Sequence, residues 1–178
     1  MILDPNETIC FWGHTHGPYA FLSNFFPFEH RGDLENSSYC AHSSEQNFMM
    51  MKAELFKDHE TKEKIIACKT AKEAKALGRQ VKNFKNSTWS VCRQIAMLVA
   101  MTQKFGGTDL QDKLLDTGEK YLIEASPYDG IWGVGLPSNN PDIYDTDKWL
   151  GLNELGHCLM ATRTGIRQEM ENANHKRS

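Results

Sequence analysis

The pattern of apolar and polar positions is clearest in the middle of the chain. Ser43 followed by Gln46 is typical of a helix N-terminus, and the apolar residues after it recur at helical spacing, which predicts a helix through about Asp58. The following segments contain no Pro and are rich in helix-forming residues, and they predict helices over residues 60–69, 71–84, 87–105 and 109–116. Gly106 and Gly107 end the longest of these helices.

The N-terminal part of the chain shows no helical pattern. Residues 8–28 mix aromatic residues with Gly and Pro, which predicts short extended pieces joined by turns. The pairs Gly32-Asp33 and Glu35-Asn36 then predict a turn before the middle helices begin.

The C-terminal part begins with a short strand, predicted over residues 121–125. Residues 126–147 are rich in Gly, Pro and Asp, and we expect them to form a long loop. Asp147 then has the position of an N-cap for a last helix, residues 148–163, which Gly165 ends.

These elements together predict a mainly α fold of the α+β class with a few short strands. The chain has 178 residues, of which 40% are hydrophobic, and this is enough to build one ordinary core. We therefore expect a single domain over residues 1–168, followed by a polar, flexible C-terminal tail over residues 169–178.

Charge and cysteine content exclude some classes of protein. The net charge of −3 argues against a protein that holds nucleic acid mainly by bulk positive charge. It does not exclude a local pocket that recognises one nucleotide. The five cysteines are scattered without a CxxC pair, which is typical of a reducing compartment. The longest apolar run, residues 95–101, is too short to span a bilayer, so we expect a soluble, cytoplasmic protein without membrane contact.

Two charged residues fall on the apolar stripe of the helix that follows Ser43. Glu45 and Lys52 are seven residues apart, which is two turns on one face. Burial of an unpaired charge costs several kcal/mol, so each side chain needs a partner or a cavity. Taken singly, Glu45 fits a helix cap and Lys52 can extend to solvent. As a pair on one stripe, they favour a functional site.

The segment SPYDGIWGVG, residues 126–135, is the second candidate. Its three glycines permit close backbone approach, and Asp129 and Trp132 add a carboxylate and a large aromatic face. The alternative is an ordinary turn in which Asp129 accepts hydrogen bonds from backbone amides and Trp132 belongs to the core. The glycine spacing matches no nucleotide-binding motif.

Two further groups of residues are candidate ligand sites. Arg79 and Lys82 would suit a phosphate or diphosphate, although such a pair is often only a solvated helix face. His14 and His16 form an H-x-H pair, but no third ligand follows at a telling spacing, so we expect no metal.

Several segments taken together resemble the NADAR family, also called YbiA-like. They are FLSNFFPF (21–28), SSEQNFMMMKA (43–53), AKALGRQVKNF (74–84), Trp89, LLDTGEKYLIEASPYDGIWGVG (114–135) and WLGLNELGHCLMATR (149–163). The resemblance runs in order over nearly the whole chain and implies a mainly helical fold with a few small strands. The three consecutive methionines in QNFMMMKA depart from the family pattern, in which polar or aromatic residues are usual.

The resemblance implies an N-glycosidase, and the chemistry of that reaction requires no metal or redox cofactor. It points to hydrolysis of the bond between ADP-ribose and guanine in nucleic acid or a nucleotide. The alternatives are hydrolysis of a ribosylaminopyrimidine phosphate from the early riboflavin pathway, which releases ribose 5-phosphate, or a non-catalytic module that binds ADP-ribose or a nucleotide. The resemblance implies no oligomeric state.

The resemblance also assigns roles to individual residues. The expected catalytic residues are Lys52, Asp129 and Glu45. The expected substrate-binding residues are Asn24, Arg79, Trp89, Ser126, Trp132, Gly133 and Asn153. The hypothesis is that these groups converge in one cavity on C1 of a sugar.

Overall fold

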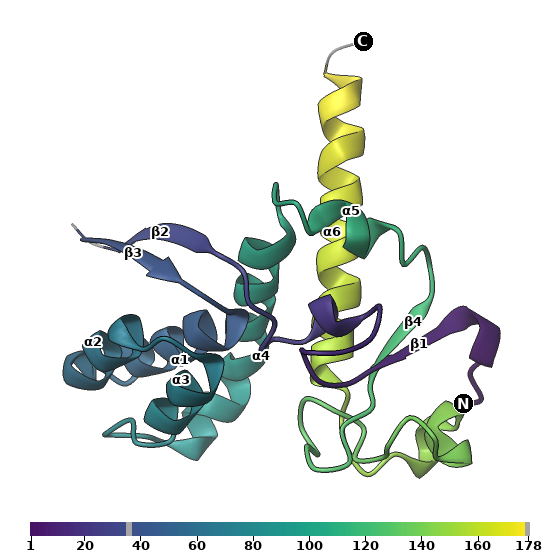
Figure 1. The fold of residues 1–178 in the computed structure, drawn as a ribbon, viewed down its shortest axis with the longest axis horizontal. Helices are drawn as coiled ribbons and strands as arrows, with labels where there is room; N and C mark the ends of the chain where they lie inside the picture. Colours follow the sequence, from purple (N-terminus) through teal and green to yellow (C-terminus); the bar gives the residue numbers. More distant parts are fainter. Residues whose placement is uncertain (35–36, 177–178) are drawn as a thin grey trace. The chain divides into compact units, whose positions relative to one another are not determined.

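In residues 1–34 and 37–176, which the computed structural model describes, six α-helices accompany two small sheets of two strands each (Figure 1). The chain forms two compact units. The middle unit is Asn24–Lys104, and the terminal unit combines Met1–Ser23 with Phe105–Ser178. The predicted class, mainly α with an α+β arrangement, is confirmed.

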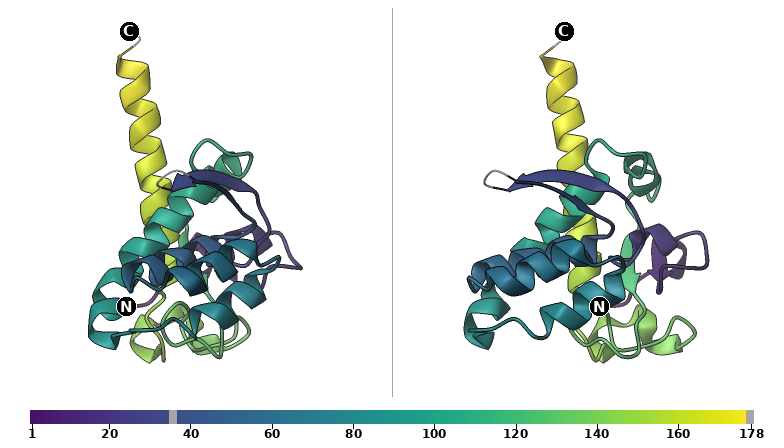
Figure 2. Two further views of the ribbon diagram at one scale, coloured as in Figure 1. Left: turned by 90° about the vertical axis from the view of Figure 1, so that its left-hand side faces the viewer. Right: turned by 60° about the vertical axis from the view of Figure 1, so that its left-hand side comes forward.

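The middle unit consists of a β-hairpin and a group of helices. Its elements are β2 (His30–Leu34), β3 (Ser37–Ala41), α1 (Ser44–Leu55), α2 (His59–Ala67), α3 (Ala71–Gly78) and α4 (Asn86–Phe105), whose last residue already belongs to the terminal unit. Strands β2 and β3 run antiparallel as a hairpin (Figure 2), and β3 contacts α1 and α2. Helix α1 also contacts α3, so it lies at the centre of this unit.

The start of α1 follows the sequence pattern with one difference. The Ser43 hydroxyl accepts a hydrogen bond from the Gln46 amide at 3.2 Å, as expected of an N-cap. The Gln46 side chain accepts from the His42 amide at 2.8 Å instead of completing the capping box. Its amide nitrogen donates to the Ile65 carbonyl at 2.8 Å, which fastens the end of α2 to the start of α1.

The terminal unit is built around a parallel strand pair. Strand β1 (Thr8–Phe11) lies beside β4 (Tyr121–Glu124) in Figure 1, although more than a hundred residues separate them. Helix α6 (Glu154–His175) contacts β4, and the short α5 (Gln111–Leu115) contacts α6. Ile123 of β4 is completely buried in the core of this unit. Because β4 is anchored in this core, it fixes the position at which the loop after Glu124 begins.

Several boundaries predicted at the C-terminal end were wrong. Residues Thr146–Lys148 form an isolated 3-10 turn, and the last helix begins only at Glu154, because Asn153 before it adopts a left-handed backbone with a φ of 53°. The helix continues through Gly165 to His175, since one glycine inside a long helix costs only about 1 kcal/mol. The domain boundary at residue 168 stays a prediction.

Two boundaries in the middle unit also differ from the prediction. The pair Gly32-Asp33 lies within β2 and makes no turn there, because it pairs with Ser38 and Tyr39 of β3. Glu35-Asn36, the other half of the predicted turn, lies outside the described residues. The third helix ends at Gly78, six residues earlier than predicted.

Two glycines in helices should respond to alanine in opposite directions. A Cβ at Gly78 would lie 1.9 Å from Sδ of Met49, so we expect Gly78→Ala to lower the free energy of unfolding by about 1–3 kcal/mol. A Cβ at Gly165 would meet nothing within 4 Å, so Gly165→Ala should raise the free energy of unfolding by about 0.5–1 kcal/mol. Urea unfolding measures both, and equal effects at the two positions would contradict the packing described at Gly78.

Candidate active site

Asn24 holds the carboxylate of Glu45 in a buried position. Glu45 lies in the first turn of α1 and only 2% of its surface is exposed. The Asn24 side-chain amide donates to Oε2 of Glu45 at 2.5 Å, and the Glu45 backbone amide donates to the Asn24 carbonyl at 2.9 Å. One residue therefore fixes both the backbone and the carboxylate of Glu45, as a group that must stabilise charge at one point requires.

Lys52 lies two turns further along α1. Its ammonium donates to the Gly78 carbonyl at 2.7 Å and lies 4.4 Å from the ring centre of Phe84 and 5.6 Å from that of Trp89. Burial lowers the pKa of Lys52, and the nearby Glu45 carboxylate, which raises it, offsets this only in part. The amine therefore loses its proton more easily than a solvated lysine, which is what a nucleophilic lysine needs.

Trp89 and Arg79 complete the predicted residues of the middle unit. Trp89 is buried and packs against Phe48, with ring centres 5.0 Å apart. Arg79 is exposed and follows Gly78 at the end of α3. Asn24, Glu45, Lys52 and Trp89 thus form one linked group, and Arg79 stands next in sequence to the carbonyl that Lys52 contacts.

The sequence analysis missed two partners of Lys52 in this group. Phe84 provides the nearer of the two aromatic rings, and Gly78 provides the carbonyl that accepts from the amine. Both lie within the segment 74–84 that carries the family resemblance. Phe84 lies in the loop between α3 and α4, so it belongs to no helical pattern of apolar residues. The Gly78 carbonyl is a backbone group, and the sequence does not indicate which carbonyl accepts a hydrogen bond.

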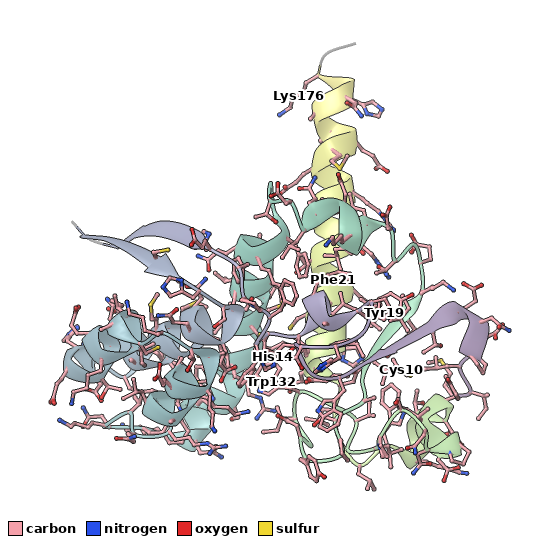
Figure 3. All side chains as sticks on the ribbon, in the orientation of Figure 1. Cys10, His14, Tyr19, Phe21, Trp132 and Lys176 are labelled. Atoms are coloured by element: carbon pink, nitrogen blue, oxygen red, sulfur yellow. The ribbon has the colours of Figure 1, made fainter. Side chains whose placement is uncertain are left out.

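In the terminal unit, Asp129 shapes the loop that follows β4. Its Oδ1 accepts hydrogen bonds from the amides of Ile131 at 3.0 Å and Trp132 at 2.8 Å, which closes a tight turn. Figure 3 labels Trp132, which is half-buried in this loop. One carboxylate oxygen of Asp129 therefore holds the turn, and its bond to the Trp132 amide fixes the backbone of that residue.

Ser126, Gly133 and Asn153 support this loop. A Cβ at Gly133 would lie 2.9 Å from the Glu124 carbonyl and from Cβ of Ser126, so only glycine fits there. Asn153 is completely buried, accepts from the Glu124 amide at 3.0 Å and donates to the Leu122 carbonyl at 2.9 Å. The side chain of Asn153 therefore fastens the segment before α6 to β4.

The predicted residues thus fall into two groups, one in each unit. The convergence of both groups on one sugar carbon stays a prediction. Among the described residues, no set of three or more His, Cys, Asp or Glu side chains is placed to hold a metal ion. Within the same residues, every helix is too short or too polar to span a bilayer.

The link between Glu45 and Lys52 can be tested directly. Removal of the Glu45 charge by Glu45→Gln should lower the pKa of Lys52 further, because the carboxylate is the neighbour that raises it. We expect the pH at which half of Lys52 is acylated to be lower in this variant. Peptide mass spectrometry measures the acylated fraction. Glu63→Gln, an exposed position on α2, is the matched control and should leave this pH unchanged. A shift to higher pH in Glu45→Gln would contradict the described coupling.

Comparison with known proteins shows similarity over most of the chain. A model of the NADAR domain matches residues 10–167. An N-glycosidase of Acanthamoeba polyphaga mimivirus is 36% identical over 144 residues, which cover 80% of this chain and 85% of that protein. An N-glycosidase of Nostoc punctiforme is 33% identical over 151 residues, which cover 84% of this chain and 87% of that protein.

A solved structure and a longer protein are also similar. The solution structure of the E. coli protein YbiA superposes with a TM-score of 0.71 at 25% identity, covering 92% of this chain and 88% of YbiA. A riboflavin biosynthesis protein of Vibrio vulnificus is 30% identical over 151 residues, which cover 84% of this chain and 36% of that protein. The fold described above is therefore shared with YbiA.

Proposed function

The chain belongs to the NADAR domain family and is an N-glycosidase, and we propose that its substrate is guanine that carries ADP-ribose, in nucleic acid or as a nucleotide. The observation that carries this proposal is the group formed by Glu45 and Lys52 of α1 with Trp89 of α4. There a buried carboxylate, an amine with a lowered pKa and an indole ring are linked by contacts within one unit.

The reaction explains why these residue types are needed. Cleavage of a ribosyl C–N bond passes through a state with positive charge on C1, which a fixed carboxylate such as Glu45 stabilises. The departing amino group needs a proton, which an ammonium or a carboxylic acid can supply. Water adds to C1, so the products are the free sugar and the unmodified base.

A covalent route uses the amine of Lys52. In the ring-opened ribose, C1 is joined to the guanine nitrogen by a C=N bond, and the amine adds to this carbon. Both amine protons then pass to the guanine nitrogen, its bond to C1 breaks, and the base leaves with a free amino group. This forms a C=N bond between the sugar and Lys52. Water then hydrolyses that bond, which releases ADP-ribose and restores the free amine.

Three further features support a substrate with a large planar base and phosphates. The half-buried indole of Trp132 offers a broad face for a bicyclic ring. The exposed guanidinium of Arg79 suits a diphosphate. With a net charge of −3, the chain would recognise such a substrate through local contacts.

A ribosylaminopyrimidine phosphate is the second candidate substrate. The relative from Vibrio vulnificus, which is named a riboflavin biosynthesis protein, favours it. Its bond also joins C1 of a ribose to an amino group, so the same residues would act on it. The two substrates differ in the size of the base and in the length of the phosphate chain.

Direct comparison of the substrates tests the proposal. We expect release of ADP-ribose from an oligonucleotide with ADP-ribosylated guanine to be faster, as kcat/KM, than release of ribose 5-phosphate from the ribosylaminopyrimidine phosphate. Turnover of the pyrimidine alone would overturn the proposed substrate. Tight binding of ADP-ribose by calorimetry without hydrolysis of either substrate would show a binding module instead.

A further inference from the structure

A separate pocket lies within the middle unit, on another face of α1. Its volume is about 450 Å³, within the range of small-molecule sites. Helix α1 contributes most of the lining and α4 contributes two residues. The apolar walls are formed by Met50, Met51, Leu55 and Val99.

This pocket is not part of the Glu45 and Lys52 group. Asn47, which lines the pocket, follows Glu45 by two residues and is therefore turned by about 200° around the helix. Lys52 does not line the pocket, whereas its neighbour Met51 does. Helix α1 thus separates two sites with different residues.

Asn47 is the feature that points to a ligand. Only 1% of its surface is exposed, and neither its side-chain nitrogen nor its oxygen has a hydrogen-bond partner among the described residues. Oε1 of Gln103, on α4, is also buried and unpartnered within that part of the chain. Buried polar groups are nearly always hydrogen-bonded in folded proteins, so these atoms lack partners that a bound molecule would supply.

The unpartnered atoms define the shape of that molecule. A carboxamide presents a donor beside an acceptor, which matches adenine, where an amino group lies beside a ring nitrogen. The second N–H of the adenine amino group is then available to Gln103. The thioethers of Met50 and Met51 suit the flat faces of such a ring.

The exposed side of the pocket suits a sugar. Glu54, whose side chain is 48% exposed, lines the pocket and forms an ion pair with Lys62 at 2.5 Å. A carboxylate in this position can accept hydrogen bonds from ribose hydroxyls. We propose that the pocket is a second binding site, which takes the adenine ring of a nucleoside or nucleotide, apart from the reaction proposed above.

Methionine methyl groups report on this pocket, because adjacent methionines of α1 face different surroundings. The full chain, labelled with ¹³C at the methionine methyl groups, is titrated with adenosine. We expect the signals of Met50 and Met51 to shift, while Met49, which packs against Gly78, does not. No shift of Met50 or Met51 at about millimolar adenosine, or an equal shift of Met49, would overturn the proposal.

The exocyclic amino group is tested with a matched ligand. Inosine differs from adenosine in having a carbonyl oxygen in place of that group, and this oxygen would face Oε1 of Gln103, another acceptor. We expect inosine to bind at least about tenfold more weakly. Gln103→Leu should remove this preference. Equal affinities for the unaltered protein would overturn the assignment of adenine.

Asn47→Leu separates ligand binding from stability. It should weaken adenosine binding at least about tenfold without a lower melting temperature, because it removes a buried carboxamide that has no hydrogen-bond partner among the described residues. Asn172→Leu, an exposed position on α6, is the matched control. Lys52→Ala should leave adenosine binding to this pocket unchanged. This variant therefore tests the pocket independently of the proposed reaction. Unchanged binding in Asn47→Leu would overturn the proposal.

Discussion

Replacement of Lys52 by alanine should lower kcat at least about a hundredfold, the usual scale for loss of an acid–base or nucleophilic group. The reason is the position of the amine. It lies near two aromatic rings, and its pKa is lowered by burial, so it is suited to attack or to transfer a proton. Single-turnover rates with saturating substrate measure this effect on the chemical step.

Two further variants show whether the loss of rate depends on the amine of Lys52 itself. Lys52→Arg keeps a positive charge but cannot form a C=N bond with the sugar, so it should be nearly as slow as Lys52→Ala. Lys72→Ala, which removes an exposed lysine from α3, should keep the full rate. A fully active Lys52→Arg would exclude the covalent route.

Borohydride trapping tests the same bond directly. Reduction during turnover should attach the sugar to Lys52, and mass spectrometry of the peptide that contains it would identify the site. Absence of the adduct from an enzyme that still turns over would favour direct attack by water.

The second large effect is expected at Asp129. Asp129→Ala should also lower kcat at least about a hundredfold, because it removes a carboxylate that can act in acid–base chemistry. It also removes the acceptor of two backbone hydrogen bonds, from Ile131 and Trp132. This variant therefore combines a chemical loss with a loosened turn.

Asp129→Asn separates the two contributions. The asparagine oxygen can still accept both backbone hydrogen bonds, but the negative charge is gone. If the charge acts in the reaction, Asp129→Asn should be as slow as Asp129→Ala. A nearly unchanged kcat in Asp129→Asn, together with a slow Asp129→Ala, would assign Asp129 to the turn alone.

Much of the middle unit could be predicted from local signals. The N-cap at Ser43 and the spacing of Glu45 and Lys52 depend on neighbours within two turns, and such patterns are visible in the sequence. The end of the third helix was harder to predict. Residues 79–84 have good helix formers, but the chain leaves the helix at Gly78. Tertiary hydrogen bonds outweigh helix propensity there, because the Gly78 carbonyl accepts from Lys52 and the Lys82 amide donates to Asp58.

The terminal unit was less predictable because its key contacts join distant residues. The substrate-binding role of Asn153 stays a prediction, and its side chain also bonds to the backbone of β4, about 30 residues earlier. Its left-handed backbone also delays the last helix to Glu154. Neither property has a local signal. We propose that Asn153 positions the loop.

The tie between Asn153 and β4 restricts where the loop can move. The amides of Asn153 and Leu152 also donate to carbonyls in the loop, at Gly133 and Gly130, both at 3.1 Å. A hinge at either end would break these bonds together with those to β4. Any movement that keeps these bonds is confined to the few residues around Tyr128, which is 87% exposed. Asp129 is next to these residues, but its carboxylate is held by the amides of Ile131 and Trp132, so it keeps its place when Tyr128 moves.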